Sequence, residues 1–182
     1  MQVKFAKRID NMKGSEIREA IKLTLKPGMI SFAGGLPAPE MKDAANHVLE
    51  EAGAVAMQYA TTEGYDPLRE KIAARMKEKY DIHTVPEQIL ITNGSQQGLD
   101  FSGKLFLDEG DVVLFESPSY MGAFNAFKAY QPRFMEVPTD EEGMIPDALE
   151  KILQTTERVK MIYVIPDFQN PTGRTWSLER RK

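Results

Sequence analysis

Residues 160–173 read KMIYVIPDFQNPTG, a short apolar run that leads into a polar segment with two prolines and a glycine. A similar succession occurs earlier, in QILITNGSQQG at 88–98 and VVLFESPSY at 112–120. Short apolar strands that alternate with helical segments are typical of a parallel sheet buried on both faces. The sequence therefore predicts an α/β fold, with strands at 88–92, 112–116, 133–137 and 160–165, and helices at 94–107, 121–130 and 146–154.

The first part of the chain has a different pattern, in which helices follow one another without strands. We expect a first helix from Ser15 to about Leu25 and a second from Asp43 to about Met57. A third is expected from Asp66 to Tyr80, because Pro67 suits the first helical position. The N-terminal part is therefore predicted to be a helical arm.

The composition limits the classes of function. The 182 residues are 42% hydrophobic and 27% charged with a formal net charge of −4, which argues against a basic nucleic-acid-binding surface. There is no cysteine, and the two histidines, His47 and His83, leave little material for a metal site or a serine-type triad. We expect no signal peptide and no membrane span, and therefore a cytoplasmic protein.

Ligands of open parallel sheets bind beyond the carboxyl ends of the strands, so the segments that follow the strands are the informative ones. In ITNGSQQG, Gly94 permits a tight turn and a helix starts at Ser95 and Gln96. The free N–H groups and the dipole of a helix N-terminus bind phosphate. The competing interpretation is an ordinary strand-to-helix turn.

Two further side chains follow predicted strands. Tyr120 can stack on a flat heterocycle, or it can simply cover the end of the sheet. Asn170, biased toward an extended conformation by Pro171, can donate to a ligand oxygen, or it can belong to a turn before a helix capped by Thr175 or Ser177. A phosphate cradle, a stacking ring and a polar donor together suit a phosphorylated aromatic cofactor such as pyridoxal phosphate.

Six segments in order resemble the fold-type I pyridoxal-phosphate aminotransferases of class I/II, in particular the 2-aminoadipate and kynurenine aminotransferase-like enzymes. They are SEIREAIKLT, ISFAGGLPAPE, QYATTEGYDPLRE, ILITNGSQQGLD, ESPSY and PDFQNPTGRTWSLERR. The resemblance implies a transaminase that moves an amino group from an amino acid to a 2-oxo acid. It also implies that residues 1–45 form an arm and part of a small domain, and that residues 46–182 form the first half of the cofactor-binding large domain.

The resemblance also implies roles for individual residues in holding pyridoxal phosphate. Ser95 and Gln96 would bind its phosphate, Tyr120 would stack on the pyridine ring, and Asn170 would donate to the phenolic oxygen. Tyr59 would reach the phosphate of the neighbouring subunit, which implies a homodimer.

For the substrate, the resemblance places Gly35 against the carboxylate. Ser15 and Arg18 match positions that shape the side-chain pocket for acidic or aromatic substrates, although Arg18 can also be a solvated helix charge. After LPAPE the family continues with a Phe-Pro pair, whereas MKDAAN follows here, so this loop departs from the family's pattern.

The family's Schiff-base lysine lies well downstream of the NPTG motif and is not found before Lys182. Lys104, Lys128 and Lys160 are expected in helices or at the start of a strand, away from the predicted site. We therefore expect a truncated N-terminal half without a catalytic residue of its own, inactive alone. Two alternatives stay open: an inactive fragment or remnant, and the aminotransferase-like effector domain of a transcription regulator.

Overall fold

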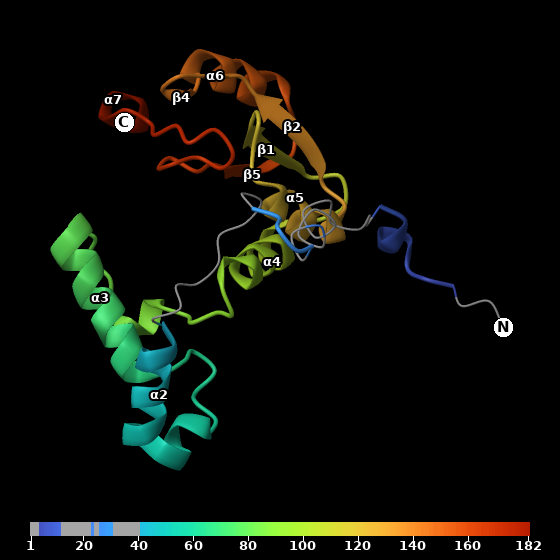
Figure 1. Ribbon diagram of the computed structural model, residues 1–182. Helices are drawn as coiled ribbons and strands as arrows, with labels where there is room; N and C mark the ends of the chain where they lie inside the picture. The colour runs from blue at the N-terminus through green and yellow to red at the C-terminus, as the bar shows by residue number, and fades with distance from the viewer. Residues whose placement is uncertain (1–3, 12–22, 24–25, 31–40) are drawn as a thin grey trace. The chain divides into compact units, whose positions relative to one another are not determined.

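The computed structural model describes residues 4–11, 23, 26–30 and 41–182 (Figure 1). The chain divides into two compact units, one of residues 1–13 with 93–182 and one of residues 14–92. The helix predicted from Ser15 to Leu25 falls outside the described residues, apart from Leu23. Near the N-terminus, a short 3-10 helix, η1, spans Lys7–Asn11.

The unit of residues 14–92 contains two of the predicted helices. One is α2 (Met41–Ala52), which continues into the 3-10 helix η2 (Gly53–Met57), and the other is α3 (Asp66–Tyr80). On α3 the guanidinium of Arg69, a residue only 8% exposed, donates to the carbonyl oxygens of Pro86 and Ile89. These bonds fix the chain that follows α3 against the helix.

The prediction of a strand at 88–92 is wrong. Pro86–Gln88 forms a 3-10 helix, η3, and the next four residues are irregular. Ile89 does have extended backbone angles, φ −114° and ψ 124°, as its apolar neighbours suggest. A strand also needs a neighbouring ladder, and the N–H of Ile91 donates instead to the loop carbonyl of Glu63 at 2.9 Å.

The other unit is built on a three-stranded parallel sheet. Its strands are β1 (Val112–Glu116), β2 (Arg133–Val137) and β5 (Val159–Tyr163), in the order β2-β1-β5. Both outer strands run parallel to β1, so all three carboxyl ends lie at the same edge. The strands predicted at 112–116 and 133–137 are confirmed, and the third begins one residue earlier than predicted.

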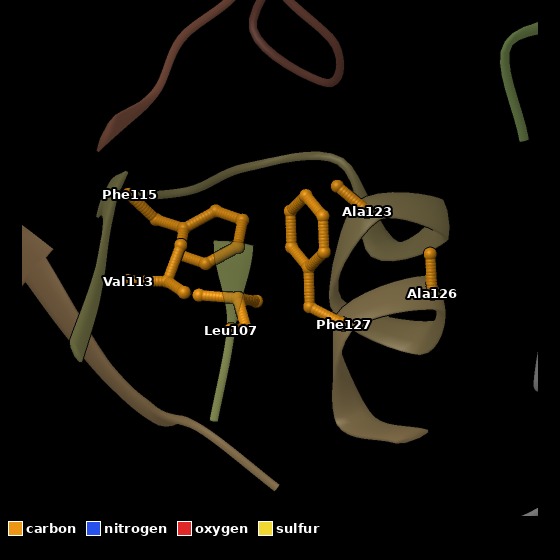
Figure 2. Packing of buried hydrophobic residues seen from close by; sticks show 6 residues of the cluster. All are labelled: Leu107, Val113, Phe115, Ala123, Ala126 and Phe127. Atoms are coloured by element: carbon orange, nitrogen blue, oxygen red, sulfur yellow. The ribbon is translucent and has the colours of Figure 1, made fainter. Parts of the chain in front are cut away.

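Helices cover both faces of this sheet, as a parallel sheet requires. They are α4 (Ser95–Phe106), α5 (Met121–Phe127), followed by the 3-10 helix η4 (Lys128–Tyr130), and α6 (Pro146–Thr155). Figure 2 shows Val113 and Phe115 of β1 pointing toward Phe127 of α5. Val112 and Leu114 point to the opposite face and pack against α6. All five residues of β1 are buried, so the core lies on this strand.

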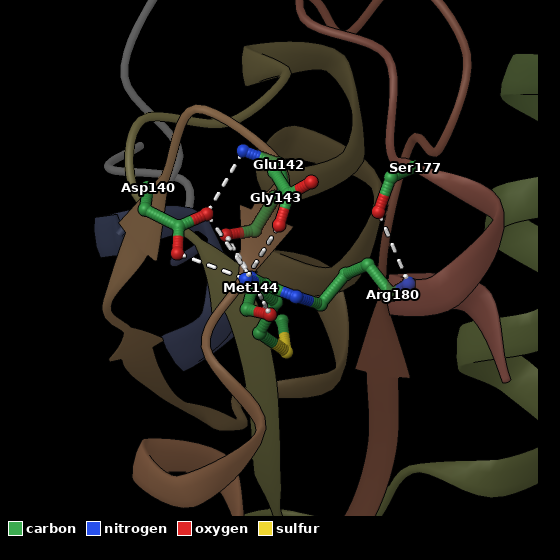
Figure 3. A network of polar contacts seen from close by, with 6 residues as sticks. All are labelled: Asp140, Glu142, Gly143, Met144, Ser177 and Arg180. Carbon is green, nitrogen blue, oxygen red and sulfur yellow. Dashed lines mark hydrogen bonds and ion pairs between the residues drawn. The ribbon is translucent and has the colours of Figure 1, made fainter.

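A small antiparallel hairpin, which the sequence did not predict, follows β2. It pairs β3 (Thr139–Asp140) with β4 (Gly143–Met144). A four-residue helix near the end of the chain, α7 (Leu178–Arg181), supplies Arg180, whose guanidinium donates to the carboxylate of Asp140 and the carbonyl of Met144 (Figure 3). Ser177 caps α7 by accepting from the N–H of Arg180 at 3.2 Å, which confirms one of the two predicted caps.

Candidate functional site

Two of the predicted binding segments leave adjacent strands at the same edge of the sheet. Residues 117–120 follow β1 and carry Tyr120, while residues 164–177 follow β5 and carry Asn170. Because β1 and β5 are parallel neighbours, both segments leave from the carboxyl edge, where open α/β sheets bind ligands. The structure therefore brings together the two segments that the sequence singled out.

A side chain that the sequence analysis did not identify joins these two segments. Gln169 is only 4% exposed, and its Nε2 donates to the carbonyl oxygen of Pro118 at 2.8 Å. Its Oε1 accepts from the N–H of Thr172 at 2.9 Å and from the hydroxyl of Thr172 at 2.7 Å. One buried amide therefore closes the turn around Asn170 and ties it to the segment that carries Tyr120.

The predicted phosphate turn lies beside the same site. α4 begins at Ser95, after Gly94, whose φ of +78° favours glycine. Both Ser95 and Gln96 are exposed, and Nε2 of Gln96 donates to the carbonyl oxygen of Gly122 at 3.0 Å. Gly122 is in the first turn of α5, two residues after Tyr120. The start of α4 is thereby connected to the segment with the aromatic ring.

The ring of Tyr120 lies directly over Gly122. A Cβ on Gly122 would lie 2.4 Å from Cε1 and Cζ of that ring, far closer than atoms can pack. Tyr120 is half-buried and packs against the core cluster around Phe115. Burial raises the pKa of the nearby Tyr163 hydroxyl, and the neighbouring Tyr120 and Glu116 raise it further, so Tyr163 stays neutral at physiological pH.

A buried carboxylate fixes the end of β1. Glu116 is 3% exposed and accepts from the N–H of Ile165 at 2.9 Å and from the indole Nε1 of Trp176 at 2.8 Å. These two bonds hold the chain after β5 against the end of β1. The only sequence signal for this role is a charged residue that ends an otherwise apolar strand, which is too common to assign a partner.

The groups left available suit a phosphorylated aromatic ligand. Within the described part of the chain, the side chains of Ser95 and Asn170 are exposed and make no hydrogen bond. The hydroxyl of Ser119, beside Tyr120, is buried and also has no partner there. Helix N–H groups with a serine hydroxyl bind phosphate, a tyrosine face takes a flat ring, and a free amide donates to an oxygen. The residues present therefore fit pyridoxal phosphate.

The remaining predicted residues are not brought to this site by the described structure. Ser15, Arg18 and Gly35 lie outside the described residues. Tyr59 belongs to the unit of residues 14–92, where it is fully exposed. Their assigned roles stay predictions.

Helices and a strand contain the three lysines Lys104, Lys128 and Lys160. Lys104 is in the last turn of α4, and Lys128 begins η4. Lys160 is the second residue of β5, near the amino end of that strand.

The described residues contain no group of three His, Cys, Asp or Glu side chains that could hold a metal ion. Among the helices described, none has the length and apolar character needed to cross a membrane.

The chain is similar in sequence to known aminotransferases. The chain is 52% identical to a 2-aminoadipate transaminase of Thermus thermophilus and 46% identical to aromatic-amino-acid aminotransferase 1 of Thermococcus litoralis. Each alignment covers 98% of this chain but 45% of the relative, so the chain spans about half the length of these relatives.

The chain is also similar to a solved aminotransferase structure and matches a family of aminotransferases. The α-aminoadipate aminotransferase of Thermus thermophilus, solved with N-(5'-phosphopyridoxyl)-L-leucine, superposes with a TM-score of 0.82 at 49% identity, over 97% of this chain and 44% of that one. That bound molecule supports the cofactor that the sequence predicts. The family "Aminotransferase class I and II" matches residues 20–181. The predicted family and fold type are confirmed, and the chain belongs to the class I and II aminotransferases.

Proposed function

We propose that this chain is part of an aminotransferase that uses pyridoxal phosphate to transfer an amino group between an amino acid and a 2-oxo acid. The observation that carries the proposal is that hydrogen bonds from Gln96 and Gln169 connect the segments that hold Ser95, Tyr120 and Asn170. The family match supports the same reaction class.

Each residue has a distinct task in this proposal. The N-terminus of α4, with Ser95 and Gln96, holds the phosphate by N–H and hydroxyl donors and the helix dipole. Tyr120 presents its face to the pyridine ring, and Asn170 donates its amide to the phenolic oxygen. When bound, pyridoxal phosphate supplies the electron sink for the chemistry at the amino acid's α-carbon. This chain's residues bind and orient that group.

The substrate and the assembly belong to the proposal as well. The names of the relatives favour an acidic or aromatic amino acid. We propose that Ser15 and Arg18 shape the pocket for its side chain and that Gly35 contacts its carboxylate. We also propose a homodimer in which Tyr59 contacts the partner's cofactor phosphate, and a cytoplasmic location.

Residues 1–45 are assigned to the arm and part of the small domain, and residues 46–182 to the first half of the large domain. The Schiff-base lysine is proposed to lie outside these 182 residues, which would then bind the cofactor without turning over substrate.

The proposal is tested with 4'-deoxypyridoxine 5'-phosphate, an analogue that has the ring, the phenolic oxygen and the phosphate but no aldehyde. Because the analogue has no aldehyde, it cannot form a Schiff base with surface lysines. Its binding therefore measures the non-covalent contacts of the site. Trp176 is the single tryptophan and is bonded to Glu116 at the same sheet edge, so its fluorescence serves as the readout.

We expect saturable quenching that is absent with unphosphorylated pyridoxine. Ser95→Ala and Asn170→Ala should each weaken binding by about tenfold, the value of a charge-assisted or ligand hydrogen bond. Equal quenching by the two compounds, or unchanged binding in both variants, would contradict the site.

A further inference from the structure

Gln169 is a buried polar residue, 4% exposed, whose side-chain amide joins the segments that carry Tyr120 and Asn170. We propose that Gln169 is a positioning residue that sets the distance between the stacking ring of Tyr120 and the donor amide of Asn170. The proposal rests on the cofactor-binding function proposed above.

Both ends of the Gln169 side-chain amide are hydrogen-bonded. Nε2 donates to the carbonyl oxygen of Pro118 at 2.8 Å, two residues before Tyr120. Oε1 accepts two bonds from Thr172, at 2.9 and 2.7 Å. The donor of this amide bonds to the loop after β1, and its acceptor bonds to the loop after β5. Because the residue is also only 4% exposed, the amide has a single orientation available.

The backbone N–H and C=O of Gln169 are hydrogen-bonded too. Its N–H donates to the carbonyl oxygen of Arg174 at 2.7 Å, and its carbonyl accepts from the N–H of Gly173. The segment 169–174 is thus a closed turn. The side-chain amide of Gln169 links this turn to the segment that follows β1. Asn170, whose side chain is exposed, is carried by that turn.

A stacking ring and a hydrogen-bond donor must both match one rigid heterocycle, so their separation matters as much as their identity. Tyr120 is already fixed against Gly122 and the core cluster. The Gln169–Pro118 hydrogen bond therefore fixes the position of Asn170 relative to the ring of Tyr120.

The donor on Pro118 can be removed selectively by Gln169→Glu, which keeps the size and the acceptor oxygen for Thr172. When ionised, the new carboxylate cannot donate to the carbonyl of Pro118 and is repelled by it. When protonated, its O–H restores the donor. Burial raises the pKa of such a carboxyl, so the protonated form should return as the pH is lowered.

The experiment measures the Kd of 4'-deoxypyridoxine 5'-phosphate by Trp176 fluorescence for the protein and for Gln169→Glu at each pH. The quantity compared is the ratio of the two Kd values, which cancels the titration of the ligand's phosphate. We expect a ratio of about ten or more at about pH 8.5 that falls toward one at about pH 6. Gln154→Glu on α6 is the control, since Gln154 Nε2 donates only to Glu150 at the surface.

A ratio near one at every pH would overturn the proposal. So would a raised ratio that does not fall with pH, because a purely structural defect has no proton to regain. If Gln169→Glu does not fold, Thr172→Val serves, as it removes the 2.7 Å bond that orients the amide. Unchanged affinity in Thr172→Val would then overturn it. If the unaltered protein does not bind 4'-deoxypyridoxine 5'-phosphate at all, that result refutes the proposed function instead.

Discussion

At the scale of single residues, the site depends on Gly122, which has no side chain, as much as on the side chains around it. The ring of Tyr120 occupies the space where a Cβ of residue 122 would be, and the carbonyl of the same Gly122 accepts from Gln96. Glycine is usually explained by its conformational freedom. Here the backbone of Gly122 is helical, so the reason for glycine is the close approach of an aromatic ring.

We predict that Gly122→Ala moves the ring of Tyr120 and weakens binding of 4'-deoxypyridoxine 5'-phosphate by about tenfold or more. The thermal midpoint should change less than the affinity, because the clash falls on a side chain and not on the backbone. Gly98→Ala in α4 is the matched control, since its Cβ would contact nothing within 4 Å. That control should bind normally and gain up to about 1 kcal/mol of stability from helix propensity. Normal binding in Gly122→Ala would show that the ring position is not critical.

The residues that sequence reasoning found and those it missed differ in a physical way. Ser95, Tyr120 and Asn170 follow strands directly, so their place at the sheet edge can be read from the order of elements. Gln169 and Glu116 act through contacts with residues about 50 positions away, namely Pro118 and Ile165. Such pairings depend on the register of the strands, which local patterns do not give.

At the scale of elements, α7 holds the β3–β4 hairpin through one guanidinium. The side chain of Arg180 is 13% exposed and pairs with Asp140 at 2.9 Å, with Glu142 farther away at 3.4 Å. The hydrogen bonds from Arg180 lower the pKa of the Asp140 carboxyl below its ordinary value of 3.8. A two-residue strand pair is too short to persist alone, so this contact supports the hairpin.

The lowered pKa predicts how this support depends on pH. An ionised Asp140 is favoured in the folded state, so its stabilisation is complete above pH 3.8 and is lost as the pH falls below that value. Asp140→Asn should therefore be less stable than the protein at neutral pH, and the difference in urea midpoint should shrink at about pH 3. Glu157→Gln, an exposed carboxylate without an ion pair in the described structure, should show no such trend. A difference that stays constant with pH would exclude the ion pair as its cause.

At the scale of the whole molecule, the three-stranded sheet has apolar side chains on an outer strand. β5 pairs with β1 along one edge, and no strand in the described part of the chain pairs with its other edge. Ile162, in this strand, is 41% exposed. An open strand edge with an apolar side chain is a site for association between chains.

Ile162→Lys should therefore keep the 182-residue chain dispersed at higher concentration, because a lysine on an edge strand opposes pairing. Light scattering over a concentration series measures this. Leu153→Lys on α6 adds the same charge to a helix surface and should have a smaller effect. If both variants behave alike, net charge and not the strand edge controls association.

Much of the molecule's architecture could be predicted from the sequence. Three elements match their predicted bounds, namely the strands 112–116 and 133–137 and the helix 66–80. Each has an uninterrupted pattern of apolar or helix-forming residues between turn-forming residues. The segment 88–92 has the same apolar character but forms no strand, since pairing needs a neighbour as well as propensity. The β3–β4 hairpin was missed because two-residue strands have no periodicity to detect.

The central position of β1 has a consequence for synthesis of the chain. β1 is translated before either of the strands that flank it, and its partner β5 begins more than 40 residues later. At roughly 5–20 residues per second, the edge of VVLF that pairs with β5 remains unpaired for about two seconds or more after β1 is made. During that interval it is the segment most apt to engage a chaperone on the ribosome, so the strand that organises the finished core is the most vulnerable one while the chain is being made.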